Sequence, residues 1–148
     1  SNDFNLGTGS LNKEHNLNNK EEILVRTIKG DQISKDFSKV DFIKIDVEGH
    51  EVNVLEGFKK TIEKYSPTIA IEISNSSLKI IRNKLDLKLL IYKKYWVFEI
   101  ITNRNRMIFF NKPNYLLRKF QFEKDILIPE INLLFYPKNF ALNKLKFN

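Results

Sequence analysis

Four side chains capable of acid–base chemistry lie in the second half of the segment DFIKIDVEGHE, Asp41–Glu51, after a short apolar run. They are Asp46, Glu48, His50 and Glu51. A carboxylate can take the proton of a substrate hydroxyl, and an imidazole titrates closest to neutral pH. Carboxylate oxygens are also the ligands that a hard divalent cation such as Mg²⁺ prefers. Catalytic or metal-binding chemistry is therefore expected at this segment.

Each of these side chains also has an ordinary structural use. Asp46 could orient or deprotonate a hydroxyl or bind a cation, but an acidic residue before a helix also caps free amides. Glu48 could act beside it, although a first-turn glutamate often only complements the helix dipole. His50 fits either a general base or a solvent-exposed histidine. Glu51 fits a cap or a solvent-facing position, and Gly49 fits a backbone need such as positive φ.

The elements that position this segment follow from hydrophobic periodicity. Apolar residues predict a strand over Asp41–Asp46 that is buried on both faces, as in a parallel sheet. After Gly49 the period becomes about 3.6, which predicts a helix that ends near Tyr65. Thr68–Ile73 predicts a second buried strand. A strand, a helix and a strand in this order form a βαβ unit with parallel strands.

Glu72 is the charged residue of the second strand, and its position brings a further carboxylate to the same place. Because the carboxyl ends of parallel strands share one edge, Glu72 is expected near Asp46 and Glu48. A buried carboxylate needs a partner, so Glu72 reaches a ligand, a metal or a hydroxyl, or a lysine from elsewhere pairs with it. Ligands of open α/β sheets bind outside this edge. We therefore predict catalytic roles for Asp46, Glu48, Glu72 and His50, and name Asp46 and Glu72 as candidate metal ligands.

The remaining sequence predicts a polar loop, further strands and further helices. Residues 1–20 are polar and are expected to form a loop. The expected elements are a strand over Glu22–Ile28, a helical turn over Ile33–Ser38, a helix from Ser76 or Ser77 through Ile91, a strand over Tyr95–Thr102, a hairpin turn over Asn103–Asn105 into a strand over Arg106–Asn111, a helix around Tyr115–Phe122 and a final strand over Ile131–Tyr136.

Four aromatic residues gather near the start of the Tyr95 strand. Tyr92, Tyr95, Trp96 and Phe98 lie within seven residues of the sequence. Aromatic side chains carry a large apolar surface and are most often found in a core or at an interface. We expect them in the core or at an oligomer face, and stacking against a sugar is the alternative.

Composition limits the classes of protein to consider. A length of 148 residues fits one domain. The net charge of +7 suits a nucleic-acid binder, but lysine outnumbers arginine 20 to 5 and is spread along the chain, so we predict no nucleic-acid partner. The absence of cysteine excludes disulfides and zinc–thiolate sites. With no signal segment or long apolar stretch in the sequence, we predict a cytoplasmic protein without a membrane partner.

The segment from Asp41 to Ile73 resembles the FkbM family of S-adenosylmethionine-dependent methyltransferases. The family's strand D-F-I-K-I-D-V-E-G is similar to Asp41–Gly49, its helix E-x-x-V-L-x-G to Glu51–Gly57, and its strand that follows a proline and ends in I-E to Pro67–Ile73. Weaker similarity involves Asn5, Gly7 and Ser10 (N-x-G-x-x-S) and Asn132–Lys138 (NLLFYPK). The resemblance implies an α/β fold with a Rossmann-like class I methyltransferase sheet, S-adenosylmethionine as cofactor, and methyl transfer to a hydroxyl of a sugar or small molecule.

The sequence departs from the family pattern at the cofactor. A Rossmann-like methyltransferase holds its donor with a glycine-rich loop of the type D-x-G-x-N-x-G after the first strand, and these 148 residues contain no such loop. We therefore expect one domain, 1–148, with an incomplete sheet made of the βαβ unit, a hairpin and a final strand. The missing N-terminal half would have roughly 80 to 100 residues. The alternative to an enzyme is a non-catalytic remnant or binding domain.

Overall fold

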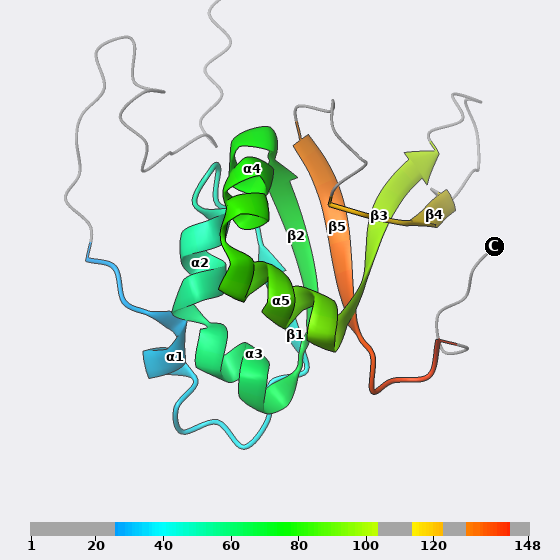
Figure 1. Ribbon diagram of the computed structural model, residues 1–148. Coiled ribbons are helices and arrows are strands. Elements are labelled where there is room, and N and C mark those ends of the chain that lie inside the picture. The colour runs from blue at the N-terminus through cyan, green and yellow to red at the C-terminus, as the bar shows by residue number, and fades with distance from the viewer. Residues whose placement is uncertain (1–25, 104–113, 123–129, 143–148) are drawn as a thin grey trace, which may run out of the picture.

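The computed structural model describes residues 26–103, 114–122 and 130–142, and five strands there form one mixed sheet. Its order is β1-β2-β5-β3-β4, and the strands are β1 (Phe42–Ile45), β2 (Thr68–Ser74), β3 (Tyr95–Asn103), β4 (Asn114–Lys119) and β5 (Glu130–Pro137). Five helices lie on one side of this sheet (Figure 1): α1 (Gly30–Ile33), α2 (Glu51–Gly57), α3 (Lys59–Tyr65), α4 (Asn75–Asn83) and α5 (Leu85–Lys94). The predicted α/β class is confirmed.

The predicted βαβ unit is present, with β1 and β2 parallel. Their register runs from Phe42 opposite Thr68 to Ile45 opposite Ile71. β5 pairs antiparallel with β2 and also with β3, and β4 pairs antiparallel with β3. The start of β5 therefore lies beside the carboxyl ends of β1 and β2. This arrangement sets which side chains meet at that end of the sheet.

The core lies between the sheet and the helices, and every second strand residue contributes to it. On β2 the isoleucines 69, 71 and 73 are buried while the residues between them are half-buried, which is the period of a strand with one covered face. The expectation that β1 is buried on both faces was wrong. Phe42 is 57% exposed and Lys44 is exposed, because β1 is an edge strand whose second face no described helix covers.

The single helix expected from Gly49 to Tyr65 is two helices, α2 and α3, which meet at Phe58. Two amides at the start of α3 bond to the Asp31 carboxylate of α1: Lys60 N donates over 3.1 Å and Thr61 N over 2.9 Å. The Phe58 ring packs on Gly30, where an added Cβ would lie 2.3 Å from it. Contacts with a segment some 30 residues earlier in the chain therefore divide the helix.

The helix expected through Ile91 is also divided, into α4 and α5 around Lys84, whose ψ is 88°. Its cap is Ser74 rather than Ser76 or Ser77, because the Ser74 hydroxyl accepts a hydrogen bond from the Ser77 amide over 3.3 Å. The predicted helical turn is shifted to α1, and Arg26–Lys29 forms no regular element, which contradicts the last part of the predicted N-terminal strand. The rest of that strand and the polar loop lie outside the described residues.

The helix expected around Tyr115–Phe122 was wrong, because this segment contains β4. β4 pairs with β3 in a register that sets Arg118 opposite Glu99. Glu99 is buried, and Arg118 Nε donates to its carboxylate over 2.9 Å. A long-range ion pair thus favours the strand over the local helical pattern. The strand predicted over Arg106–Asn111 lies outside the described residues.

Candidate functional site

Carboxylates from β2, from β5 and from the turn and helix that follow β1 meet at the end of the sheet where β1 and β2 finish and β5 begins. One small cavity of about 10 Å³, room for a single water-sized group, is lined by Asp46, Glu48, Gly49, Glu51, Glu72, Ser74 and Glu130. We call its five carboxylate residues, Asp46, Glu48, Glu51, Glu72 and Glu130, the acidic cluster. The parallel pairing of β1 and β2 brings together Asp46, Glu48 and Glu72, as the sequence predicted.

The turn after β1 places Glu48 at this cavity through an uncommon backbone conformation. Glu48 has φ 44° and Gly49 has φ 93°, and the His50 amide donates to the Val47 carbonyl over 3.2 Å. Two central residues with positive φ are typical of a type I′ turn. Glycine adopts such a φ without the steric cost that a glutamate bears, so the backbone role predicted for Gly49 is confirmed.

The buried Glu51 side chain stabilises the turn by a hydrogen bond to its backbone. It is only 2% exposed, and its carboxylate accepts hydrogen bonds from the Gly49 amide over 2.7 Å, from the Ser74 hydroxyl over 3.4 Å and from the Ser77 hydroxyl. These bonds satisfy the oxygens of a buried carboxyl group whose burial would otherwise be costly. Glu51 therefore acts as a cap for the turn, and its expected alternative, a solvent-facing position, was wrong.

The surroundings of Glu72 raise its affinity for a proton. Partial burial, and then the negative charges of Asp46, Glu130 and Glu48, raise the pKa of Glu72 above its ordinary value, while the Lys44 charge opposes them. Lys44 pairs with Asp46 instead, over 3.2 Å. Glu72 forms no hydrogen bond or ion pair with a described residue. The alternative in which a lysine pairs with Glu72 is therefore not found among the described residues, and the raised pKa makes Glu72 a stronger base than an ordinary glutamate.

His50 lines a different cavity from the carboxylates. This cavity, of about 630 Å³, is formed by residues 27–30, Ile33, Asn53, Val54, Gly57 and Phe58 together with His50. The His50 Nε2 atom is buried and has no hydrogen-bond partner in the structure. In the sequence His50 lies close to Glu48, but His50 is the N-terminal cap residue of α2 and its side chain lines the other cavity. The structure therefore does not bring His50 into the acidic cavity.

Comparison with known protein families gives one match. The model of the methyltransferase FkbM domain matches residues 1–94, which is more than half of the chain. The chain belongs to the FkbM methyltransferase family. Comparisons with curated proteins and with solved structures found no significant match. Membership in this family indicates methyl transfer. The matched residues include Asp41–Ile73, where the resemblance is densest.

The family match does not reach every segment considered in the sequence. It ends at Lys94, so the similarity of Asn132–Lys138 to a family strand remains a prediction. Among the described residues of this FkbM domain, no helix is both long and apolar enough to cross a membrane. The same part of the chain contains no group of three or more His, Cys, Asp or Glu residues arranged to hold a metal ion, so the structure gives the predicted divalent cation at Asp46 and Glu72 no support.

Sequence reasoning missed Glu130, the fifth member of the acidic cluster in this FkbM domain. Glu130 lies opposite Ser74 in the β2–β5 register and contributes to the raised pKa of Glu72. A signal was present in its position at the start of the last strand. If that strand is placed antiparallel to β2, its first residue must lie at the carboxyl end of β2. The pairing partner, however, is not readable from local periodicity.

Proposed function

We propose that this FkbM domain transfers a methyl group from S-adenosylmethionine to a hydroxyl of a sugar or small molecule, with Glu72 as the general base. The observation that carries the proposal is the position of Glu72, without a partner among the described residues, at the strand end shared with Asp46 and Glu48. A base with a raised pKa binds the substrate proton more firmly, and a positioned base typically contributes about 10²- to 10⁴-fold to a rate.

Each carboxylate has a separate part in this reaction. The acceptor hydroxyl would lie against Glu72, whose carboxylate would take the hydroxyl proton as the oxygen accepts the methyl group from the donor. S-adenosylmethionine supplies the electrophilic methyl group when it is bound. Asp46, held by Lys44 over 3.2 Å, and Glu48 would orient the hydroxyl, and their negative potential would suit a cationic methyl donor.

The sheet supports a Rossmann-like interpretation of the fold. β1 and β2 form a parallel edge followed by antiparallel strands, with helices on one face. β1 has no second neighbour among the described strands, and Phe42 is exposed there. In a complete class I methyltransferase sheet the donor-binding half would join at this edge. The glycine-rich loop that would hold the donor is not in these 148 residues.

The alternative function is that of a non-catalytic remnant that binds a substrate or partner, which the missing loop favours. The gene sequence upstream of Ser1 discriminates between the two. An in-frame D-x-G-x-N-x-G motif supports the enzyme, and its absence supports the remnant. Calorimetric titration of the 148-residue chain with S-adenosylmethionine should show no binding.

The direct test uses a protein that carries the upstream motif and a radiolabelled methyl donor. Methyl transfer should fall in Glu72→Gln, and Glu130→Gln should shift the acidic limb of the pH–rate profile to lower pH because a charge that raises the Glu72 pKa is removed. Unchanged turnover in Glu72→Gln would exclude the proposed base. A Glu72-dependent rate with an unshifted pH profile in Glu130→Gln would exclude the electrostatic role of Glu130.

A further inference from the structure

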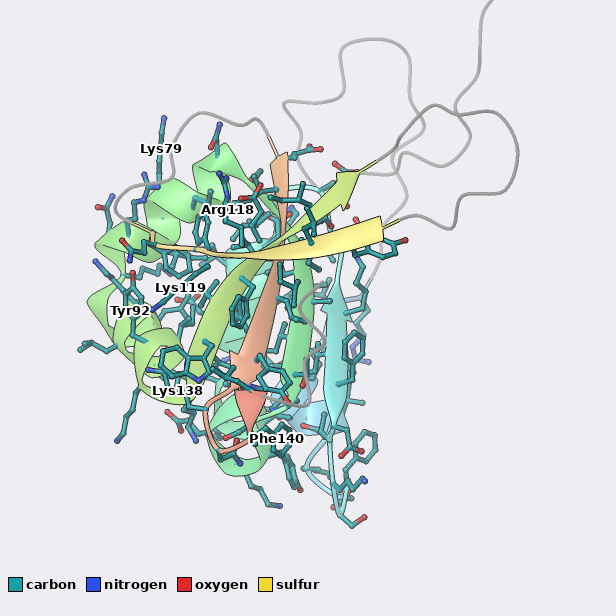
Figure 2. The ribbon with its side chains drawn as sticks, turned by 90° about the vertical axis from the view of Figure 1, so that its right-hand side faces the viewer. Lys79, Tyr92, Arg118, Lys119, Lys138 and Phe140 are labelled. Atoms are coloured by element: carbon teal, nitrogen blue, oxygen red, sulfur yellow. The ribbon has the colours of Figure 1, made fainter. Side chains whose placement is uncertain are left out.

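A third pocket lies at the opposite end of the sheet from the acidic cluster. It has a volume of about 330 Å³ and is lined by Tyr92, Tyr95, Trp96, Val97, Lys119, Phe120, Gln121 and Lys138. We call it the basic aromatic pocket. It is formed where α5 ends, β3 begins and the chain leaves β4 and β5, and Figure 2 shows Tyr92, Lys119 and Lys138 on this part of the molecule. Its size is within the range of small-molecule sites.

Two ammonium groups of this pocket lie over one indole. Lys119 Nζ is 5.3 Å and Lys138 Nζ is 4.9 Å from the centre of the Trp96 ring. Neither lysine forms an ion pair with a described residue, and Lys119 makes no hydrogen bond there. The nearby Arg118 is already matched by Glu99. The two lysines therefore carry positive charge that no carboxylate among the described residues offsets.

The aromatic walls add a flat apolar surface and an unused polar group. Trp96 and Tyr92 are half-buried, so part of each ring is accessible. Tyr95 is 1% exposed, and its hydroxyl has no hydrogen-bond partner in the structure. A buried hydroxyl without a partner costs stability, and such groups in a native protein call for an explanation. A ligand oxygen would supply the missing partner.

We propose that the basic aromatic pocket binds a phosphorylated small molecule that carries a flat or ring-shaped group. The phosphate is held by the ammonium groups of Lys119 and Lys138, which lie over the same ring and are thus at most about 10 Å apart in the free protein. The ring of the ligand lies against Trp96, a contact that is favourable for bases and for sugars. Mononucleotides and sugar phosphates share this chemistry.

The pocket is separate from the proposed methyl-transfer site. β5 runs from Glu130, in the acidic cluster, to Pro137, next to Lys138, so the two ends are roughly 25 Å apart at the rise of a β-strand. The bounded volume favours a small molecule over a nucleic-acid strand, which would need an extended basic groove. Binding at this pocket therefore does not depend on the proposed function.

Isothermal titration of the 148-residue chain with AMP, glucose 1-phosphate, adenosine and inorganic phosphate tests the proposal. AMP or glucose 1-phosphate should bind more tightly than adenosine and inorganic phosphate, because only these two ligands offer both a charge and a ring. Which of the two binds more tightly identifies the ligand class. Lys119→Gln should weaken that binding about tenfold, the value of one charge-assisted hydrogen bond. Trp96→Leu should weaken binding of the ring-bearing ligand but not of inorganic phosphate.

Lys79→Gln is the matched control, because Lys79 is an exposed lysine of α4 far from the pocket (Figure 2). This variant should bind as tightly as the unmodified chain. If Lys79→Gln and Lys119→Gln weaken binding equally, the loss of affinity follows from the change in net charge alone, and the proposal is overturned. No binding of either phosphorylated probe at 10-mM concentration, or binding of a single-stranded oligonucleotide without binding of AMP, would also overturn it. Circular dichroism of each variant verifies that the fold is retained.

Discussion

The two ends of the sheet differ in charge, in space and in how their charges are satisfied. At the end where β1 and β2 finish, the acidic cluster encloses about 10 Å³, and Glu72 has no pairing partner there among the described residues. At the other end, two lysines rest over Trp96 beside a pocket of about 330 Å³. The first arrangement adjusts the affinity for a proton, and the second leaves positive charge and space for an anion.

This difference also explains why composition was a poor guide. A net charge of +7 gives no information about where the charges lie. In the structure, an acidic site and a basic pocket lie at opposite ends of one strand, β5. Like charges are held together at both ends, by backbone geometry at Glu48 and by an aromatic ring at Trp96. Local potential, rather than net charge, therefore decides which ligand each end suits.

The largest expected effect concerns the acidic end. In a protein that carries the donor-binding motif, Glu72→Gln should lower kcat by about 10²- to 10⁴-fold, because a general base is lost. Lys119→Gln in the same protein should leave kcat unchanged if the two ends act separately. A radiolabelled methyl-transfer assay measures both, and a comparable loss in Lys119→Gln would remove the distinction between the two ends.

The same Glu72→Gln substitution should stabilise the 148-residue chain near pH 7. The pKa of Glu72 is raised in the folded state, so its stabilising contribution is present below the ordinary carboxyl pKa and is lost as the pH rises through the folded-state pKa. Glutamine does not titrate and avoids this loss. Thermal unfolding should give a higher Tm for the variant at pH 7 and equal values below about pH 4. A lower Tm at pH 7 would contradict the unfavourable charge environment.

Gly30→Ala should destabilise the contact between α1 and the junction of α2 and α3 by about 1–3 kcal/mol, because its Cβ would overlap the Phe58 ring. Gly57→Ala is the control, since a Cβ there meets its nearest atom at an ordinary 3.5 Å. Urea denaturation should show a loss of stability for the first variant and none for the second. AMP or glucose 1-phosphate binding should persist in both folded variants, and its loss would show that the basic aromatic pocket depends on the α1 contacts.

Asp31→Ala should cost about 1 kcal/mol at pH 7, the usual value of a helix cap. Burial raises the pKa of Asp31, but the hydrogen bonds from Thr61 and Lys60 outweigh it and hold the pKa below its ordinary value. This contribution is present above the unfolded-state pKa and is lost as the pH falls through the folded-state pKa, the opposite sign to Glu72. Urea unfolding at pH 7 and pH 3 measures the difference, and a cost that grows in acid would refute the cap.

The smallest effect is expected at the basic end. Tyr95→Phe removes a buried hydroxyl without a partner and should stabilise the free protein by up to about 1 kcal/mol. The same change should weaken binding of the phosphorylated ligand. Differential scanning calorimetry with and without ligand measures both. A destabilised variant would show that the hydroxyl already has a favourable partner in the free protein.

Local sequence patterns predicted the part of the fold whose interactions are local. The strand–helix–strand order, the parallel pairing and the meeting of Asp46, Glu48 and Glu72 all follow from periodicity and from the handedness of a βαβ unit. The positive φ of Gly49 also follows from residue type. The meeting of three of the five carboxylates of the acidic cluster was therefore readable from the sequence, whereas the presence of Glu130 and the placement of His50 in another cavity were not.

The remaining features depend on partners far away in the sequence. β4 is stabilised by the Glu99–Arg118 pair across the strands, although its own residues suggested a helix. Asp31 determines where α3 begins from some 30 residues earlier. Glu130 joins the acidic cluster only because β5 pairs with β2, and no local periodicity specifies that pairing.

β5 is hydrogen-bonded on both sides, to β2 and to β3. Its first residue, Glu130, belongs to the acidic cluster, and Lys138 of the basic aromatic pocket follows its last residue. A strand paired along both edges resists local distortion, and its amides should be among the slowest to exchange. An element with a single arrangement cannot pass a change of state from one ligand to another. The coupling free energy between the two sites is therefore expected to be close to zero, so that each ligand binds with the same affinity whether or not the other is present.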